Sequence, residues 1–444
     1  MWKQTVDFSS RTLYTVCVSA AWEGQDLSEE LSGRLRAAAK FLRVFLKWLA
    51  IASVTGVVGG LIGTAFYLSV AGANSLRESF PELLWLLPAI GIVIALIYRY
   101  THMESESTNA VIDSIHLGER IPLGLVPVIF ASTVLTHLGG GSAGREGAAL
   151  QIGGGLGWSM GRLFRLDEKD MRLATLCGMS ALFSALFGTP LTAAIFALEV
   201  ISVGVVYYSG LVPCLTSALA AFGITRLFGI APTRFVIEAP ALSADILWRI
   251  AVLGVACAVM SIVFCETMHR SEHFISKTIK NPCLRAAAGG FVIIALTYVC
   301  GTTDYNGAGT AVIGRAIAEG EAEPAAFVLK LVFTAITLGC GFRGGEVVPT
   351  FFIGATLGCV LGPLLGIPAG FAAAVGLVAL FCGAVNCPVA SVILSVELFG
   401  SGGVVLFAVA CAVSYMLSGY TGLYSSQKIL YSKLRAEFID IHAK

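Results

Sequence analysis

Two related glycine-rich stretches decide the fold of this chain. The first reads GREGAALQIGGGLG at residues 144–157, and the second reads GGEVVPTFFIGATLG at residues 344–358. Each places an acidic residue near its start, ahead of an apolar run broken by glycines, and this pattern predicts a helix that begins at the charged end. One local pattern therefore occurs twice, about 200 residues apart.

The text that follows the two stretches repeats as well. GTPLTAAIFALEV contains Pro190 and NCPVASVILSVEL contains Pro388, and a glutamate stands nine residues past each proline, at Glu199 and Glu397. The triplet Ala-Leu-Phe precedes each segment. Chance similarity of glycine- and alanine-rich text is the alternative. Because order and spacing agree together, we predict two structural repeats, although the text alone does not say whether they are parallel or inverted.

The composition places most of this chain in a membrane. Of its 444 residues, 56% are hydrophobic and 13% are charged, against about 25% charged residues in soluble proteins. The run Val347–Val396 is 50 residues long and carries no charge. Since a helix crosses the hydrocarbon core with about 20 residues, this run must fold back more than once.

We predict an all-α polytopic membrane protein built from tilted and broken helices, whose 50 glycines allow close helix contacts. The predicted full or partial spans are 41–72, 83–100, 121–139, 146–163, 171–187, 190–225, 247–269, 285–302, 325–341, 346–365, 368–384, 388–399, 402–419 and 421–437. A segment 1–40 precedes a first membrane repeat (41–228), a second repeat (229–420) and a C-terminal helix within 421–444.

Basic residues set the expected orientation. Residues 1–40 show no cleavable signal peptide, and an amphipathic helix is expected near 27–45. The positive-inside rule places both termini in the cytoplasm and the protein in the plasma (inner) membrane. The basic residues that favour this are Arg34, Arg36, Lys40, Arg43, Lys47, Lys428, Lys433 and Arg435. We expect no soluble regulatory (CBS) domain.

Charge and cysteine usage exclude several classes of partner. The net charge of +1 gives no reason to expect a nucleic-acid partner. The 12 cysteines stand singly in apolar text without a CxxC pair, so they predict neither disulfides nor a zinc site. We expect no metal and no cofactor.

Each glycine-rich stretch offers an anion site. The first N–H groups of a helix lack partners and carry partial positive charge, so they bind anions without a full cation. Loops 139–147 and 339–345 would let such groups reach the ion. Glu146 can place its carboxylate in the anion's position or, after taking up a proton, swing away. It can thus be gate and proton carrier; the alternative is that Glu146 pairs with Arg145 at a membrane surface.

These motifs resemble the CLC family of chloride channels and anion/proton antiporters. Leu138–Gly153 and GFRGGEVVP (341–349) are similar to its two anion-binding loops, and Leu423-Tyr-Ser425 to its final helix. The resemblance covers about residues 40–435 and implies a homodimer with one pore per subunit, built as an inverted repeat. It implies Glu146 as gating glutamate, Tyr424 as inner-gate hydroxyl, and anion contacts at Gly144, Arg145, Gly345, Glu346, Val347 and Val348. It also implies a dimer interface at 190–225 and 388–419.

The chain departs from the usual family sequence in the loop that supplies side-chain donors to the anion and at the acid that accepts protons from the inner side. The first loop usually reads GSGIP, but here it reads Glu106-Ser-Thr-Asn-Ala110. Ser107, Thr108 or Asn109 must therefore supply any side-chain donor, and the text leaves open which one does. The inner proton-accepting acid of the family is Val200 in this chain. An internal proton would have to arrive through water or directly at Glu146.

Other departures concern the anion. Glu346 stands where chloride-selective members usually have an apolar residue, and the texts around Leu135–Leu138 and Phe351–Gly354 are most similar to the fluoride-selective branch. That branch exchanges fluoride for protons. It commonly has Met or Asn in the first loop and Thr where Val348 stands. Because this chain has Thr108 and Val348 there, chloride stays an alternative to fluoride as the transported anion.

Several polar residues have a structural interpretation. Glu346 can form a buried pair with Arg343, one helical turn earlier. Glu199 and Glu397 are expected to be structural, and His137 to be a satisfied interior histidine.

Two motifs mimic enzyme signatures. Ser142 in GGSAG fits a nucleophile elbow, and the glycines at 139, 141 and 144 fit a dinucleotide fingerprint. Both need a preceding strand, whereas 125–138 is typical of a membrane helix. An intramembrane serine hydrolase stays a remote alternative, and we expect no enzyme.

The functional prediction is transport of a small halide through a proton-coupled fluoride antiporter, with Glu146 carrying the proton and Tyr424 closing the inner side. A chloride/proton antiporter and a passive chloride channel stay open, and the missing inner acid favours the channel. The expected partners are fluoride or chloride, protons, the lipid bilayer and a second copy of the chain.

Overall fold

The computed structural model of the chain describes residues 27–104, 106–435 and 437–444. Contacts along the chain divide it into two compact units, Met1–Ala50 and Ile51–Lys444.

In the first unit, the described residues form the beginning of helix α2 (Leu27–Ser79). Its side chains from Gly33 onward are mostly exposed, Leu35 and Phe41 among them. The helix expected over 27–45 is therefore present, as part of a longer one. The remainder of the predicted cytosolic segment, residues 1–26, lies outside the described residues.

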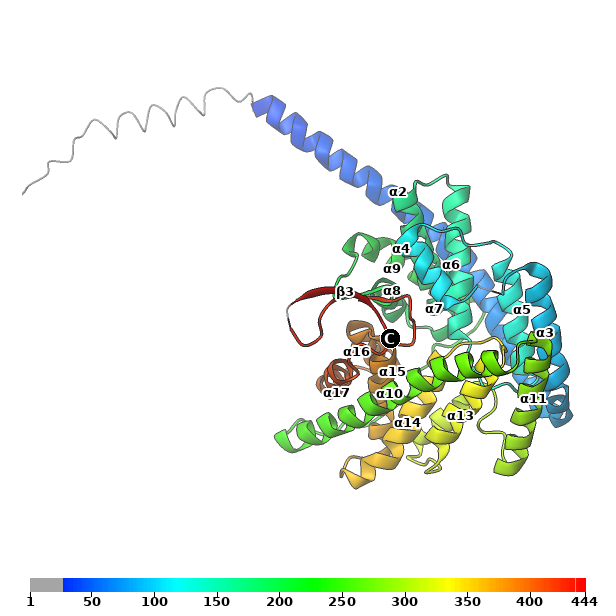
Figure 1. Cartoon of the computed structure of the whole chain (residues 1–444). Helices are drawn as coiled ribbons and strands as arrows, with labels where there is room; N and C mark the ends of the chain where they lie inside the picture. Colours follow the sequence, from blue (N-terminus) through cyan, green and yellow to red (C-terminus); the bar gives the residue numbers. More distant parts are fainter. Residues whose placement is uncertain (1–26, 105, 436) are drawn as a thin grey trace, which may run out of the picture. The chain divides into compact units, whose positions relative to one another are not determined.

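The second unit is a helical bundle (Figure 1). After α2 its elements are η1 (Pro81–Leu86), α3 (Leu87–Thr101), α4 (Thr108–Leu117), α5 (Leu125–Leu138), α6 (Glu146–Leu163), α7 (Glu168–Phe187), α8 (Pro190–Glu199), β1 (Ser202–Val203), η2 (Tyr208–Gly210) and α9 (Leu211–Leu227). They continue with α10 (Ala244–Thr278), α11 (Pro282–Cys300), α12 (Thr310–Ala318), α13 (Ala326–Gly339), α14 (Val347–Leu364), α15 (Ala369–Val385), α16 (Pro388–Phe399), α17 (Val404–Leu417), β2 (Lys428–Tyr431) and β3 (Phe438–His442).

Several helices are suited to a bilayer. Seven stretches of the described chain are long and apolar enough to cross it, namely Gly33–Ser79, Pro81–Thr101, Glu168–Phe187, Tyr208–Leu227, Ala244–Thr278, Pro282–Cys300 and Val347–Leu364. Other apolar helices, such as α8 and α16, have only 10 to 17 residues. This mixture of full and partial spans confirms the predicted all-α polytopic class.

Two glutamates cap helices of the opposite repeat. Glu199, the last residue of α8, accepts hydrogen bonds from the N–H groups of Val389 and Ala390 at the start of α16 (3.1 and 2.8 Å). Glu397 of α16 accepts from two N–H groups at the start of α8 (3.0 and 2.8 Å). Each carboxylate thereby satisfies donors that a helix start leaves unpaired. The expected structural role of both glutamates is confirmed.

The loops before α6 and α14 exchange hydrogen bonds in the same way. The hydroxyl of Thr136 accepts from the N–H of Arg343 (3.2 Å), and the hydroxyl of Thr337 accepts from the N–H of Ser142 (3.1 Å). Thr136 and Ser142 of the first repeat correspond to Thr337 and Arg343 of the second. The two hydrogen bonds are therefore the same bond with the repeats exchanged, which means that a two-fold rotation relates the two halves. This is the arrangement of the predicted inverted repeat.

The prediction of a C-terminal helix within 421–444 is wrong. The described residues there form a loop followed by β2 and β3, which pair antiparallel, while β1 pairs parallel with β2. The side chains of 438–442 alternate between exposed and half-buried, as strands require. The side chain of Gln427 holds the segment by donating to the carbonyls of Val200 and Val385 (3.0 and 2.9 Å).

The predicted single span 190–225 is also wrong. It is two helices, α8 and α9, separated by β1 and η2. Gly204 has a φ of +93°, a left-handed conformation that favours glycine and interrupts the helix. The short helices α4 and α12 were not predicted, because ten residues or fewer carry little periodicity.

The crossed caps give a first expected result. Glu199→Ala should lower the free energy of unfolding by about 1–3 kcal/mol, because two helix-start N–H groups lose their acceptor. Glu397→Ala should cost less, since the donors that it caps are more exposed. Thermal unfolding in detergent measures both, with Glu319→Ala, an exposed glutamate, as control. Equal melting temperatures for all three variants would contradict the capping role.

Candidate functional site

The starts of α6 and α14 meet at a backbone junction. The N–H of Gly144 donates to the carbonyl of Gly345, and the N–H of Gly345 donates to the carbonyl of Gly144, both at 2.7 Å. A Cβ on Gly345 would lie 2.7 Å from the backbone nitrogen of Glu146, so only glycine permits this approach. The structure thus brings together the two glycine-rich stretches, with Arg145, Val347 and the other predicted residues of both loops.

Glu146 lies wholly buried at this junction. Its Oε2 accepts a hydrogen bond from the backbone N–H of Arg145 (2.8 Å), and its Oε1 has no hydrogen-bond partner. The guanidinium of Arg145 lies over the ring of Tyr67 (4.5 Å) and donates to the carbonyl of Leu186 (3.3 Å), and its Nε is 3.7 Å from Oε1. The carboxylate therefore lies buried at the start of its own helix, where it also forms a 3.7 Å ion pair with Arg145. The considered pair is present, but it is not at a surface.

Glu346 does not form the pair with Arg343 that was considered. Among the described residues no ion pair joins them, and the Arg343 guanidinium stacks on the ring of Tyr98 at 4.1 Å. The Oε2 atom of Glu346 is buried without a hydrogen-bond partner. Val347 and Val348 are buried beside it. The junction thus holds two buried carboxylates, each with one oxygen that accepts no hydrogen bond.

The three candidates of the first loop have different surroundings. The Ser107 hydroxyl caps α4 by accepting from the Ala110 N–H (3.4 Å). The Asn109 side chain accepts from the N–H of Ser426 (3.2 Å). The Thr108 hydroxyl alone among the three contacts α6, where it donates to the carbonyl of Gly147 at 3.5 Å.

Tyr424 reaches the same region from the C-terminal loop. Its side chain is buried, and its hydroxyl has no hydrogen-bond partner. Two hydrogen bonds fix the backbone beside it. The N–H of Leu423 donates to the carbonyl of Ala384 (2.8 Å), and the carbonyl of Leu423 lies within hydrogen-bond distance of His269 Nε2 (3.2 Å). A loop, not a helix, positions this tyrosine.

The family described as "voltage gated chloride channel" matches residues 90–419, most of the chain. The chain belongs to this CLC family. The chain is 37% identical over 396 residues to the "chloride/fluoride channel protein" of Pseudomonas syringae pv. tomato, covering 87% of each chain. It is 25% identical to the H(+)/Cl(-) exchange transporter ClcA of Yersinia pestis, in an alignment that again covers 87% of each chain.

Solved CLC structures share the fold. The structure described as a CLC-type fluoride/proton antiporter matches with a TM-score of 0.84 and 31% identity, over 86% of this chain and 98% of that one. A slow cyanobacterial Cl−/H+ antiporter matches with a TM-score of 0.70 at 19% identity, over 84% and 94% of the two chains, which shows the fold alone. These matches confirm the resemblance on which the CLC prediction rests.

The enzyme-like motif has no catalytic geometry. The hydroxyl of Ser142 bonds to that of Thr334 (3.1 Å), and the ring of His137 points its Nε2 to the carbonyl of Gly144 (3.4 Å). The loop containing Ser142 follows helix α5 rather than a strand. His137 is interior as expected, although its Nδ1 has no partner.

Several residues that were not predicted from the sequence support the CLC junction. Thr136 and Thr337 fix the two glycine-rich loops, and Gln151 donates to the Thr108 hydroxyl (3.2 Å). Lys330 is fully buried and donates to the carbonyls of Tyr305 and Gly307 (3.1 and 2.6 Å). The spacing of the threonines was a usable signal. Thr136 and Thr337 each stand six residues before Ser142 and Arg343, which are equivalent positions of the two repeats, and each threonine binds the one in the other repeat.

Proposed function

We propose that this protein exchanges fluoride for protons across the membrane. The observation that carries the proposal is the buried Glu146 carboxylate, which lies at the start of α6 with one oxygen that accepts no hydrogen bond. A carboxylate at that position competes with an anion for the same N–H groups. Protonation neutralises the carboxylate, which then no longer competes with the anion. Similarity to the CLC-type fluoride/proton antiporter supports exchange and supports fluoride.

In this mechanism the anion sits at the junction of the two helix starts. N–H groups of both glycine-rich loops replace part of its hydration shell, and the Tyr424 hydroxyl, which has no partner, adds a donor. The Thr108 hydroxyl adds another when its proton turns from the carbonyl of Gly147 to the anion. Fluoride holds water strongly, so a dense set of donors is required before it enters. Tyr424 closes the inner side.

The inner proton route is the open step of the mechanism. Val200 cannot titrate, so protons from the inner side must use water or another group. Glu346 is the other buried carboxylate at the junction, and its Oε2 also lacks a hydrogen-bond partner. We assign Glu346 as the candidate second proton carrier. A passive channel is the second candidate function, favoured by Val200 alone.

The membrane arrangement belongs to the same proposal. Both termini lie in the cytoplasm, as the basic residues before α2 and near the C-terminus favour. A homodimer forms in the plasma membrane through the 190–225 and 388–419 segments. Their exposed apolar side chains, such as Leu191, Val389 and Val405, support that interface.

Liposome flux separates the two candidates. The purified protein is reconstituted, a fluoride or chloride gradient is imposed, and internal pH is recorded. Uphill proton movement driven by fluoride supports antiport. Rapid anion flux without proton movement supports the channel, and coupling to chloride alone supports a chloride exchanger.

Val348→Thr tests the anion preference. The side chain is buried beside Gly144, and threonine keeps its shape while adding a hydroxyl. One added hydrogen bond of about 1 kcal/mol should raise the fluoride-to-chloride flux ratio by about fivefold. Val348→Ala, which removes bulk without adding a donor, is the control. An unchanged flux ratio in Val348→Thr would show that this loop does not determine the anion preference.

A further inference from the structure

A second set of cationic groups lies away from Glu146, at one end of the neighbouring helices α3 and α11. A cavity of about 250 Å³ opens between the last turns of α3, the first turn of α11 and the loop before α14. Tyr98, Glu104, Arg285 and Arg343 supply its polar lining. None of these residues takes part in the transport mechanism above.

Arg343 offers free donors to this cavity. Its guanidinium carbon lies 4.1 Å from the centroid of the Tyr98 ring, so one face of the group is stacked. Stacking leaves the N–H edges of a guanidinium available for planar recognition. Its Nε and the Tyr98 hydroxyl are both buried without a hydrogen-bond partner. Buried donors without partners are rare in folded proteins, which points to a missing acceptor.

Arg285 faces the same space from α11. Its Nε is also buried without a partner, and a Cβ on Gly341 would lie 3.7 Å from its Nη2. Within the described ranges, neither arginine forms an ion pair, and Glu104 at the exposed rim is the only acidic residue of the lining. Two guanidinium groups thus line one cavity with a single, exposed carboxylate, and neither forms an ion pair with it.

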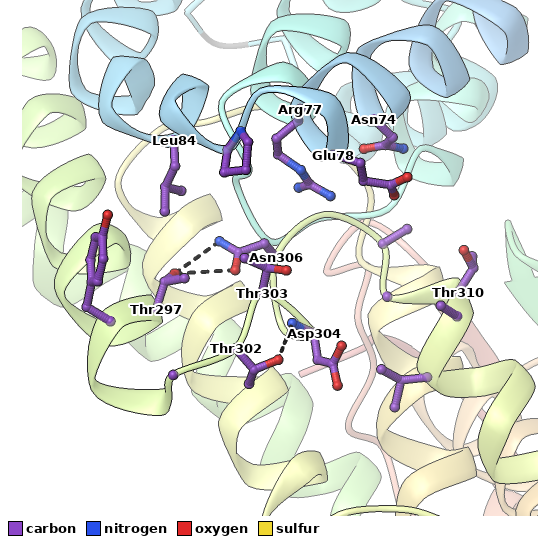
Figure 2. Close-up of a pocket in the computed structure, with 17 residues that line it drawn as sticks. Asn74, Arg77, Glu78, Leu84, Thr297, Thr302, Thr303, Asp304, Asn306 and Thr310 are labelled. Carbon is purple, nitrogen blue, oxygen red and sulfur yellow. Dashed lines mark hydrogen bonds between the residues drawn. The ribbon is translucent and has the colours of Figure 1, made fainter.

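The cavity at the other end of α3 and α11 shows the contrast. It has a volume of about 770 Å³ and contains Arg77, which Figure 2 shows reaching toward Asn306. Two acids, Glu78 and Asp304, line that cavity too, and Asp304 pairs with Arg315. Acids therefore outnumber Arg77 in that lining, whereas two arginines face a single exposed glutamate in the smaller cavity.

We propose that the cavity between α3, α11 and the loop before α14 binds a phosphate group, with Arg285 and Arg343 as its ligands and the Tyr98 hydroxyl as a further donor. Arginine forks match the oxygens of a phosphate in bidentate fashion. A volume of about 250 Å³ exceeds the needs of a halide. This site is independent of the proposed fluoride exchange.

The phosphate group can come from two sources. Basic pockets between membrane helices bind the headgroups of anionic lipids, and free phosphate reaches the same pocket from the aqueous side. Both sources present the same oxygens to the arginines. Arg343 precedes Gly345 by two residues, so occupancy would also steady the loop that forms the helix junction.

The test measures ligand-dependent thermal stability of the full-length protein in a nonionic detergent. Inorganic phosphate, at constant ionic strength with gluconate as the replacing anion, should raise the melting temperature by mass action. Arg285→Gln and Arg343→Gln should abolish this rise. Arg285→Lys keeps the charge but loses the fork, and should raise the half-saturating phosphate concentration by about tenfold.

Arg99→Gln is the matched control, because Arg99 adjoins Tyr98 in α3, has the same charge and is exposed; it should keep the full response. A second arm compares phosphatidylglycerol with phosphatidylcholine. A rise with inorganic phosphate alone identifies the free ion, and a stronger rise with phosphatidylglycerol identifies the headgroup. No rise with either ligand, an equal rise in the glutamine variants, or an unchanged half-saturation in Arg285→Lys overturns the proposal.

Discussion

Glu146→Gln should reduce fluoride-driven proton movement to the background of protein-free liposomes. The amide keeps the size of the side chain but cannot exchange a proton, so the step that couples the two ions is lost. The effect should be all-or-none, because the buried carboxylate is the titratable group placed at the helix start. Internal pH and fluoride flux, recorded in parallel from the same liposomes, measure it.

Glu168→Gln provides the matched control for this experiment. Glu168 is also the first residue of a helix, α7, but it is exposed. Its substitution changes charge by the same amount and should leave proton movement at the wild-type rate. Proton coupling that survives in Glu146→Gln would remove Glu146 from its proposed role.

Gly345→Ala should abolish anion flux. The added Cβ would lie 2.7 Å from the backbone nitrogen of Glu146 and closer still to that of Gly147, and neither is a flexible side chain that can move aside. The two helix starts must separate, and both 2.7 Å bonds between Gly144 and Gly345 are lost. Losing them should cost about 2–3 kcal/mol, and the N–H groups would no longer surround one anion.

Gly314→Ala controls for the general effect of the substitution. A Cβ on Gly314 meets nothing within 4 Å, so its flux should match the wild type. Flux is normalised to the protein that elutes as a single folded species, which separates loss of the site from loss of folding. Wild-type flux in folded Gly345→Ala would show that the close junction is not needed for transport.

The repeat and its helix starts could be predicted from sequence because local patterns encode them. Glycine, proline and glutamate at matched positions such as Pro190 and Pro388 mark helix starts in each half. The pairing of Gly144 with Gly345 follows once the two halves are related by a two-fold rotation. Pattern alone therefore locates the two loops, whereas their meeting depends on the arrangement of the two halves in space.

The C-terminal segment was not predictable in the same way. The strands at 428–431 and 438–442 form because β1, more than 200 residues earlier, offers an edge to β2. No local pattern near Tyr424 reveals that partner. The convergence of Arg285 and Arg343 likewise depends on how α3, α11 and the second glycine-rich loop come together in three dimensions. Such contacts are set by tertiary structure, which overrides local propensity.

The crossed caps of α8 and α16 bear on how the chain is made. When the ribosome has completed α8, the acceptor for its first N–H groups, Glu397, is still about 200 residues from being synthesised. The carboxylate of Glu199 must likewise wait for α16. During insertion the early half thus holds unmatched donors and an unmatched acid within a nonpolar solvent. The starts of α8 and α16 can therefore acquire these acceptors only after both halves have been synthesised.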